Sequence, residues 1–124
     1  MTAPGTVNST CIGAAVLMLA ACAQREREVP AVPGGDADRG RAALVAHGCG
    51  ACHRIPGIPA ARGTVGPPLA DFRERLYIAG LEPNVPDKLV AWIRDAPAVR
   101  PGTAMPDLDV SDAEARDMAA YLYR

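Results

Sequence analysis

Apolar residues recur at helical spacing in separate stretches of the chain. Gly40, Leu44 and Gly48 are four positions apart, so they would share one face of a helix that begins at an Asp38 N-cap. Small residues on that face would let a second helix approach closely. Another amphipathic stretch spans residues 86–95 and places its apolar side chains at the spacing of a buried stripe: Leu89, Trp92 and Ile93.

The last predicted helix begins at a capping box. Ser111 and Glu114 are spaced so that each side chain can bond the other residue's backbone N–H. Four apolar residues then line one side of the helix: Ala115, Met118, Ala119 and Leu122. A short helix is expected between about residues 69 and 80, and the Pro- and Gly-rich residues 54–69 and 96–110 are predicted to be loops. With no convincing strand, the pattern predicts an all-α domain whose helices are joined by long loops.

The composition allows only a thin protein core. The chain has 124 residues, enough for one domain, but only 4% of them are aromatic, and Gly and Pro number 12 each. Helices joined by such loops need additional apolar bulk at the centre, which a bound cofactor would supply. The formal net charge of −1 excludes the basic footprint that is typical of nucleic-acid binding.

Five consecutive residues, Cys49-Gly50-Ala51-Cys52-His53, carry the candidate chemistry. Two thiols three positions apart, followed at once by a histidine, form the attachment signature of a c-type haem. Each thiol would bond one vinyl group of the porphyrin, and His53 would then lie beneath the iron and bind it. A thioredoxin-type redox pair needs surrounding strands, a zinc site needs four ligands, and a structural disulfide leaves the histidine unexplained.

The N-terminal part of the chain has the features of an export signal followed by a tether. Residues 11–21 are uncharged and apolar but too few to span a bilayer, which takes about 20 residues. Leu19-Ala20-Ala21-Cys22 resembles the bacterial lipobox, in which the signal is cut before a cysteine that becomes lipidated. Residues 1–10 lack the usual positive charge, so a plain secretory signal with an incidental cysteine and an uncleaved anchor are alternatives. We expect a signal peptide over 1–21, a lipidated Cys22 and flexible tether over 22–36, and one domain over 37–124.

The second axial position of a haem iron is filled in electron carriers and open in sensors and catalysts. Met105 lies in a Pro- and Gly-rich loop, where the backbone can present a thioether to a metal. Met118 lies on the inner side of the last predicted helix and is better explained as core. His47 is another candidate, but the attachment motif already supplies His53, which favours a surface or helix-end position for His47.

From about residue 37 onward the chain resembles the class I cytochromes c, an all-helical family with a single haem. The motif at Cys49 and four later segments resemble family segments in the right order: Gly66-Pro67-Pro68-Leu69, Leu89-Val90-Ala91-Trp92-Ile93, Pro101-Gly102-Thr103-Ala104-Met105 and Ala119-Ala120-Tyr121-Leu122. Leu44 departs from the aromatic residue that the family often has. The chain is also similar to small lipoprotein cytochromes associated with bacterial respiratory oxidases.

The resemblance implies a set of residues that ligate or surround the haem: His53, Met105, Pro67, Leu69, Trp92 and Thr103. The carbonyl of Pro67 would accept the Nδ1 proton of His53 and so fix its tautomer. Thr103 would lie near a haem propionate. The aromatic ring of Tyr121 would cross the first helix over Gly40.

These features predict a protein that carries single electrons on one covalently bound haem c, ligated by His53 and Met105. It would use no small-molecule substrate and would not be an enzyme. It would lie on the periplasmic side of a membrane, anchored by the lipid on Cys22, and pass electrons from a respiratory donor to a terminal oxidase. Two alternatives stay open: a permanently bound cytochrome subunit of an oxidase, and a haem-based sensor or peroxidase with an open sixth site.

Overall fold

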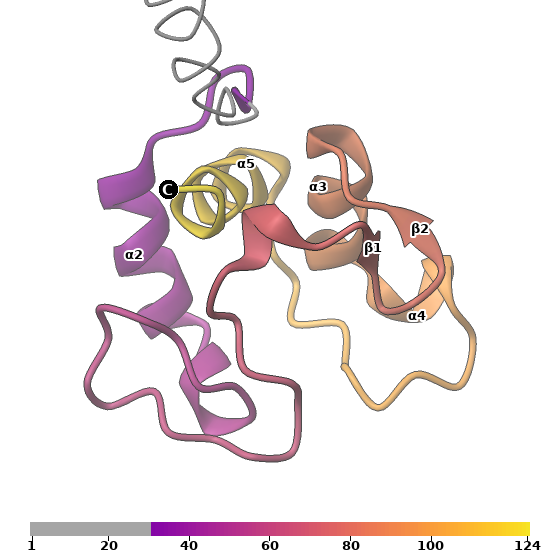
Figure 1. Cartoon of the computed structure of the whole chain (residues 1–124), viewed down its shortest axis with the longest axis horizontal. Coiled ribbons are helices and arrows are strands. Elements are labelled where there is room, and N and C mark those ends of the chain that lie inside the picture. The colour runs from indigo at the N-terminus through magenta and orange to yellow at the C-terminus, as the bar shows by residue number, and fades with distance from the viewer. Residues whose placement is uncertain (1–30) are drawn as a thin grey trace, which may run out of the picture.

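The computed structural model describes residues 31–124 (Figure 1). The expected signal peptide, the expected lipidated Cys22 and the first half of the expected tether lie outside these residues. In chain order the elements are α2 (Ala37–Ala46), η1 (Cys49–Ala51), η2 (Phe72–Glu74), β1 (Tyr77–Ile78), β2 (Glu82–Pro83), α3 (Pro86–Arg94), α4 (Ala96–Val99) and α5 (Asp112–Leu122). Helices and long loops account for nearly all of the described residues, so the all-α prediction is confirmed.

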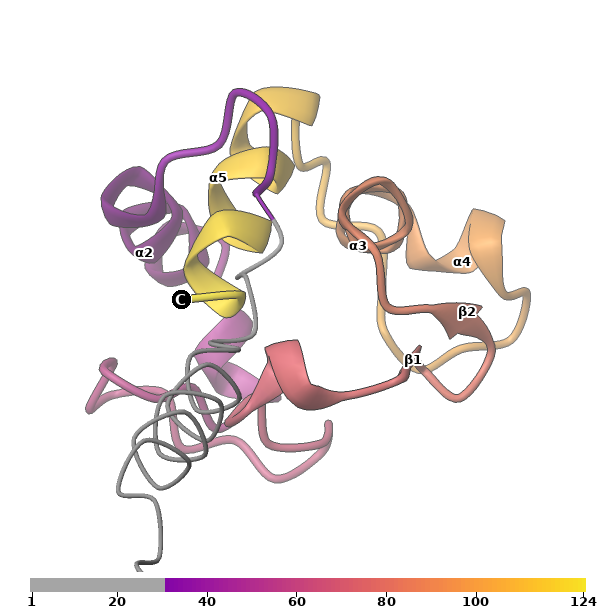
Figure 2. The ribbon, with the colours of Figure 1, turned by 45° about the horizontal axis from the view of Figure 1, so that its top comes forward.

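The centre of the fold is the crossing of α2 and α5 (Figures 1 and 2). Gly40 is buried at the crossing, and a Cβ built on it would lie only 1.9 Å from the carbonyl oxygen of Asp117. Helix α3 packs against α5 as well. The core is formed by apolar residues of all three helices together with loop residues, and the predicted inner face of α5 is buried: Ala115, Met118, Ala119 and Leu122.

Tyr121 lies on α5 one turn after Asp117, whose backbone would meet a Cβ added to Gly40. That the ring of Tyr121 crosses the first helix over Gly40 stays a prediction. The hydroxyl of Tyr121 donates to the carbonyl of Pro56 at 2.6 Å. Tyr121 therefore ties α5 to the loop after η1, and the helix crossing depends on backbone contact at a glycine.

Helix α2 begins two residues earlier than the sequence suggests. Asp36 is its N-cap, with extended backbone and a side chain that accepts the N–H of Arg39, and Asp38 lies in the first turn. The helix ends at Ala46, and Gly48 follows it in the left-handed conformation at φ +67°, exposed rather than on the buried face. His47 is the C-cap, which confirms its helix-end position.

The short helix expected between about residues 69 and 80 is wrong. The chain makes only the single 3-10 turn η2 and then the antiparallel hairpin of β1 and β2. Ala79 and Gly80 at the hairpin turn have φ values of +51° and +70°, a conformation in which a helix cannot continue. Ile78 is buried while the preceding Tyr77 is 57% exposed, which is the alternation of a strand.

The remaining helices lie close to their predicted positions. Helix α3 has Pro at its first position and buries Leu89 and Val90, with Trp92 and Ile93 packed against the core. The capping box of Ser111 and Glu114 is present at the start of α5. Residues 96–110 are not all loop, because Ala96–Val99 forms the short helix α4. Within residues 31–124, no helix has the length and apolar character needed to cross a bilayer.

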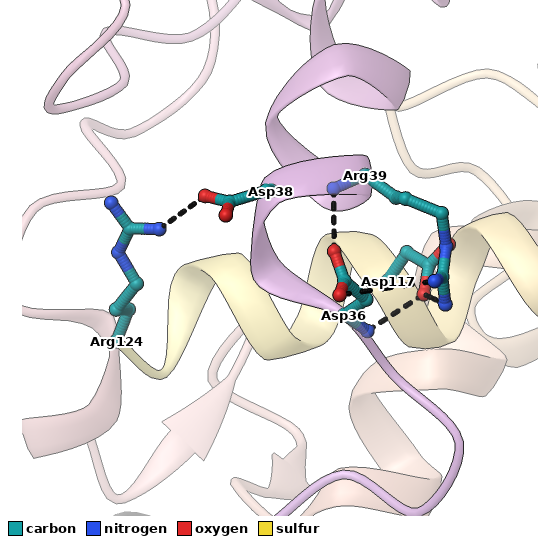
Figure 3. Close-up of polar contacts among 5 residues, drawn as sticks. All are labelled: Asp36, Asp38, Arg39, Asp117 and Arg124. Carbon is teal, nitrogen blue, oxygen red and sulfur yellow. Dashed lines mark hydrogen bonds and ion pairs between the residues drawn. The ribbon is translucent and has the colours of Figure 1, made fainter.

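A buried carboxylate fastens the segment before α2 to α5 (Figure 3). Asp117 accepts the backbone N–H of Asp36 at 2.7 Å and two N–H groups of the Arg39 guanidinium at 2.8 Å each. Its side chain is only 10% exposed, whereas that of Arg39 is 64% exposed. The hydrogen bonds from Arg39 hold the pKa of Asp117 below its ordinary value of 3.8.

The Asp117 carboxylate is expected to make the fold acid-sensitive. A lowered pKa stabilises the fold above the ordinary pKa, and that stability is lost as the pH falls through the lowered value. Asp117→Asn is expected to lower the free energy of unfolding at pH 7 by about 2 kcal/mol and to reduce its pH dependence below pH 4. The measurement is guanidinium denaturation at a series of pH values. Asp38→Asn is the control, because the Asp38 side chain is 92% exposed and, among residues 31–124, pairs only with Arg124, so its loss should cost about 0.5 kcal/mol or less.

Candidate functional site

The two thiols and the histidine of the attachment motif lie on one tight turn. Gly48 brings the chain out of α2, and η1 then begins at Cys49. The carbonyl of Cys49 accepts the backbone N–H of Cys52 at 3.3 Å and that of His53 at 3.0 Å. Both thiols are half-buried and free of any disulfide. The turn therefore presents two unbonded thiols and an imidazole from five consecutive residues.

The ring of His53 is held by the loop that follows it. Its Nδ1 lies 2.7 Å from the carbonyl oxygen of Pro67, and because a carbonyl can only accept, Nδ1 carries the proton. The Nε2 atom, which then bears the lone pair, has no hydrogen-bond partner among residues 31–124. A Cβ on Gly66 would lie 2.3 Å from the Cε1 atom of the ring, so glycine is required for the loop to pass behind His53. The implied role of Pro67 matches this geometry.

Two more glycines let the same loop close against the attachment turn. A Cβ on Gly63 would lie 2.3 Å from the carbonyl carbon of Cys52, and one on Gly50 would lie 2.7 Å from the Cα of Ala61. The N–H of Gly63 donates to the carbonyl of Gly50 at 3.0 Å. Gly63 lies in residues 54–69, which the sequence predicts only as a loop, and no sequence pattern indicates this contact. The loop and the attachment turn therefore form one closely packed unit.

The chemistry of the thiols disfavours the alternative sites. Burial raises the pKa of Cys49, whereas a nucleophilic redox cysteine needs a lowered pKa. The two strands are two residues long each and lie far along the chain from the motif, unlike a thioredoxin setting. Within residues 31–124 no three or more His, Cys, Asp or Glu side chains are grouped to hold a metal ion. A redox pair and a zinc site are both poor descriptions of this turn.

The other expected site residues are distributed over the loops and α3. Leu69 and Trp92 are partly buried and pack against the core. Met105 is half-buried in the segment between α4 and α5, and its N–H donates to the hydroxyl of Thr103 at 3.3 Å. In Figure 1 this segment and the loop after η1 both run below α5. His47 is engaged elsewhere, since its Nε2 lies 3.1 Å from a carboxylate oxygen of Glu114.

The donor set fits a covalently held porphyrin. The free Nε2 of His53 is a nitrogen ligand with its tautomer already fixed, and the adjacent Cys49 and Cys52 are available for thioether bonds. Val65 is a large apolar residue that is 77% exposed, and it adjoins the glycine that packs on His53. An exposed apolar side chain next to this glycine suits an apolar group that covers it.

Residues 37–123 match the cytochrome c family. The chain belongs to the cytochrome c family. This cytochrome is 36% identical over 87 residues to the cytochrome c oxidase subunit 2 of Alkalihalophilus pseudofirmus, a match that covers 69% of this chain and 25% of that protein. The chain thus spans about a quarter of the length of this curated relative. No solved structure matches the chain.

Membership confirms the fold and the general function expected from the sequence. The few helices and long loops of residues 31–124 are those of a class I cytochrome c. The family also implies a haem cofactor, and with it a role in electron transport.

Proposed function

We propose that this cytochrome is a one-electron carrier whose single haem c is bonded to Cys49 and Cys52 and ligated by His53 and Met105. The observation that carries the proposal is the geometry at His53. Its Nδ1 is committed to the carbonyl of Pro67 at 2.7 Å, which leaves Nε2 as a free ligand beside two unpaired thiols. The haem iron, when bound, supplies the one-electron couple.

Each protein group has a defined task in this mechanism. The hydrogen bond from His53 to Pro67 keeps the imidazole in one tautomer and makes Nε2 a stronger electron-pair donor to a metal. The Met105 thioether, presented by its Pro- and Gly-rich segment, favours the ferrous state and raises the reduction potential. If His53 and Met105 both hold the iron in both oxidation states, electron transfer would need little rearrangement of the protein around it. The apolar Val65 would lie against the cofactor and exclude water from it.

We further propose that the protein is exported and held at the periplasmic face of a membrane by a lipidated Cys22. The lipobox-like Leu19-Ala20-Ala21-Cys22 supports this, as does the Pro- and Gly-rich composition of the stretch before α2. A respiratory donor and a terminal oxidase are the redox partners that the similarity to an oxidase subunit favours.

The same similarity supports a second candidate function, a cytochrome subunit bound permanently to an oxidase. The 87 matching residues of the relative belong to an oxidase subunit rather than to a separate carrier. Size-exclusion chromatography of gently solubilised membranes distinguishes the two. A carrier elutes as a small free protein, and a subunit co-elutes with the oxidase.

The test of the cofactor and of the anchor is the mass of the protein purified from its native host membranes. We expect the polypeptide to begin at Cys22 and to carry the mass of one haem together with acyl chains. After denaturation Cys49 and Cys52 should not react with an alkylating reagent, because both sulfurs are bonded to the porphyrin. A polypeptide with two reactive thiols and no haem mass would overturn the proposed site. A haem-bearing form without acyl mass would remove only the anchor.

The reduced-minus-oxidised absorption spectrum of the same material tests the ligands. A six-coordinate, low-spin spectrum with the weak far-red band of ferric iron bound to a thioether is expected. Rapid binding of carbon monoxide by the reduced native protein would instead identify an open sixth site and favour a sensor or peroxidase.

A further inference from the structure

The loop that carries the hydrogen-bond acceptor of His53 is itself held by one arginine. The guanidinium of Arg75 donates to the carbonyl of Pro68 and, at 3.2 Å, to that of Ala70. The guanidinium carbon Cζ of Arg75 lies 5.1 Å from the centre of the Phe72 ring, and this cation–π contact helps to keep the guanidinium in place. Within residues 31–124 Arg75 forms no ion pair with a carboxylate, so backbone carbonyls are its polar partners.

Asn84 follows directly after β2 and fixes the backbone around Arg75. Its amide nitrogen donates to the carbonyls of Phe72 at 2.8 Å and Arg75 at 2.9 Å, which uses both of its hydrogens. Its own backbone N–H donates to the carbonyl of Leu76 at 3.0 Å. Asn84 therefore holds η2 and the residues after it at three points, two through its side chain and one through its backbone.

The network ends in the core at the C-terminus. The amide oxygen of Asn84 accepts the hydroxyl of Tyr123 at 2.8 Å. Tyr123 is 1% exposed, and burial raises its pKa to about 12, so the hydroxyl keeps its proton and donates throughout the physiological range. The hydroxyl orients the amide, since it can donate only to the oxygen while both carbonyls can accept only from the nitrogen.

We propose that Asn84 and Arg75 are positioning residues for His53. They fix residues 67–70, whose Pro67 carbonyl accepts the Nδ1 proton of His53, and so set the strength of that hydrogen bond. A stronger bond gives the imidazole more negative character, which stabilises ferric iron and lowers the reduction potential. The proposal rests on the proposed role of His53 as an iron ligand.

The positive charge of Arg75 gives a competing account that predicts the opposite sign. A cation near the haem disfavours ferric iron, so loss of the charge would lower the potential. The hydrogen bonds by which Arg75 and Asn84 hold residues 67–70 are called the brace below. Their loss would loosen the bond between His53 and Pro67 and raise the potential. Arg75→Lys separates the two effects, because lysine keeps the charge but its side chain is one atom shorter than the path to Nη2, the arginine nitrogen that bonds both carbonyls, so the ammonium should not reach both of them.

The experiment uses the haem-loaded protein and two measurements, the midpoint potential and the hydrogen exchange rate of the His53 Nδ1 proton by NMR. Arg75→Lys is expected to raise the potential and to speed the exchange by about tenfold, the equivalent of one lost hydrogen bond. Tyr123→Phe, which removes one bond to Asn84, should change both in the same direction and by less.

Two controls carry the same substitutions outside the brace. Arg73→Lys alters an exposed arginine that pairs with Glu74, and Tyr121→Phe removes a hydroxyl bonded to Pro56 at 2.6 Å. Arg73→Lys should leave the potential and the exchange rate at the native values. Tyr121→Phe loosens the loop after η1 at Pro56 without touching Arg75 or Asn84. It therefore shows what general loosening of the fold does to each readout, and its effect should be smaller than that of Arg75→Lys.

The outcomes separate this proposal from the function on which it rests. If native protein shows the expected haem spectrum, but Arg75→Lys leaves both readouts at the native values or lowers the potential, the brace is wrong and the carrier function stands. If native protein carries no covalent haem, or if His53 is not a ligand, both the positioning role and the proposed carrier function are wrong.

Discussion

Gly40→Ala is expected to lower the free energy of unfolding by about 3 kcal/mol, the upper end of what an overpacked core costs. The added Cβ would lie 1.9 Å from the carbonyl oxygen of Asp117, 2.4 Å from its carbonyl carbon and 2.9 Å from the nitrogen of Met118. All three are backbone atoms of α5, so no side chain can rotate to make room. The two helices would have to move apart, which loosens the apolar contacts across the crossing.

Guanidinium denaturation followed by far-UV circular dichroism measures this effect. Gly48→Ala is the matched control, because Gly48 has no neighbour within 4 Å of an added Cβ and only its left-handed φ of +67° opposes alanine. We expect that strain to cost about 1 kcal/mol. Equal losses in the two variants would mean that the close approach of α2 and α5 does not limit the stability of the fold.

The helices were predictable because their signals are local. The capping box of Ser111 and Glu114 and the apolar spacing that follows it need only a few neighbouring residues to be recognised. The sequence predicts Asp38 as the first N-cap, whereas the structure has Asp36 there, and Asp117 accepts the N–H of Asp36 from 81 residues away. Contacts of this range are not visible in a local pattern.

The helix predicted between residues 69 and 80 was wrong for the same reason, because long-range contacts decide the structure there. The apolar residues there fit a short helix, but the chain turns at Ala79 and Gly80, and Asn84 takes the carbonyls of Phe72 and Arg75 that a helix would have used. Tertiary hydrogen bonds outweigh the weak local preference.

The candidate site also contains residues that the sequence predicts and residues that it does not. The attachment turn was predictable because the covalent chemistry of a porphyrin requires two thiols and a histidine at fixed spacing. The acceptor at Pro67 followed from the family resemblance, and its geometry agrees with that role. Arg75, Asn84 and Tyr123 were not found, since a brace made of bonds to backbone carbonyls leaves no motif in the sequence.

Met105→Leu is expected to open the iron to external ligands while leaving the fold almost unchanged. Leucine has nearly the volume of methionine but no sulfur, so it fills the same space without binding the metal. The reduced variant should bind carbon monoxide stoichiometrically, whereas the native protein should bind almost none. The far-red band of the ferric form should disappear, and the reduction potential should fall because the thioether no longer favours ferrous iron.

Met118→Leu is the matched control, since Met118 is 0% exposed on α5 and its sulfur serves only as core. A volume-conserving change there should cost less than about 1.5 kcal/mol and leave the spectrum and the potential as they are. Met105 is half-buried in a segment with little regular structure, and only a ligand role explains a spectroscopic effect confined to that methionine. A Met105→Leu protein that keeps the far-red band and excludes carbon monoxide would contradict the assignment, and the sixth ligand would then have to be another residue.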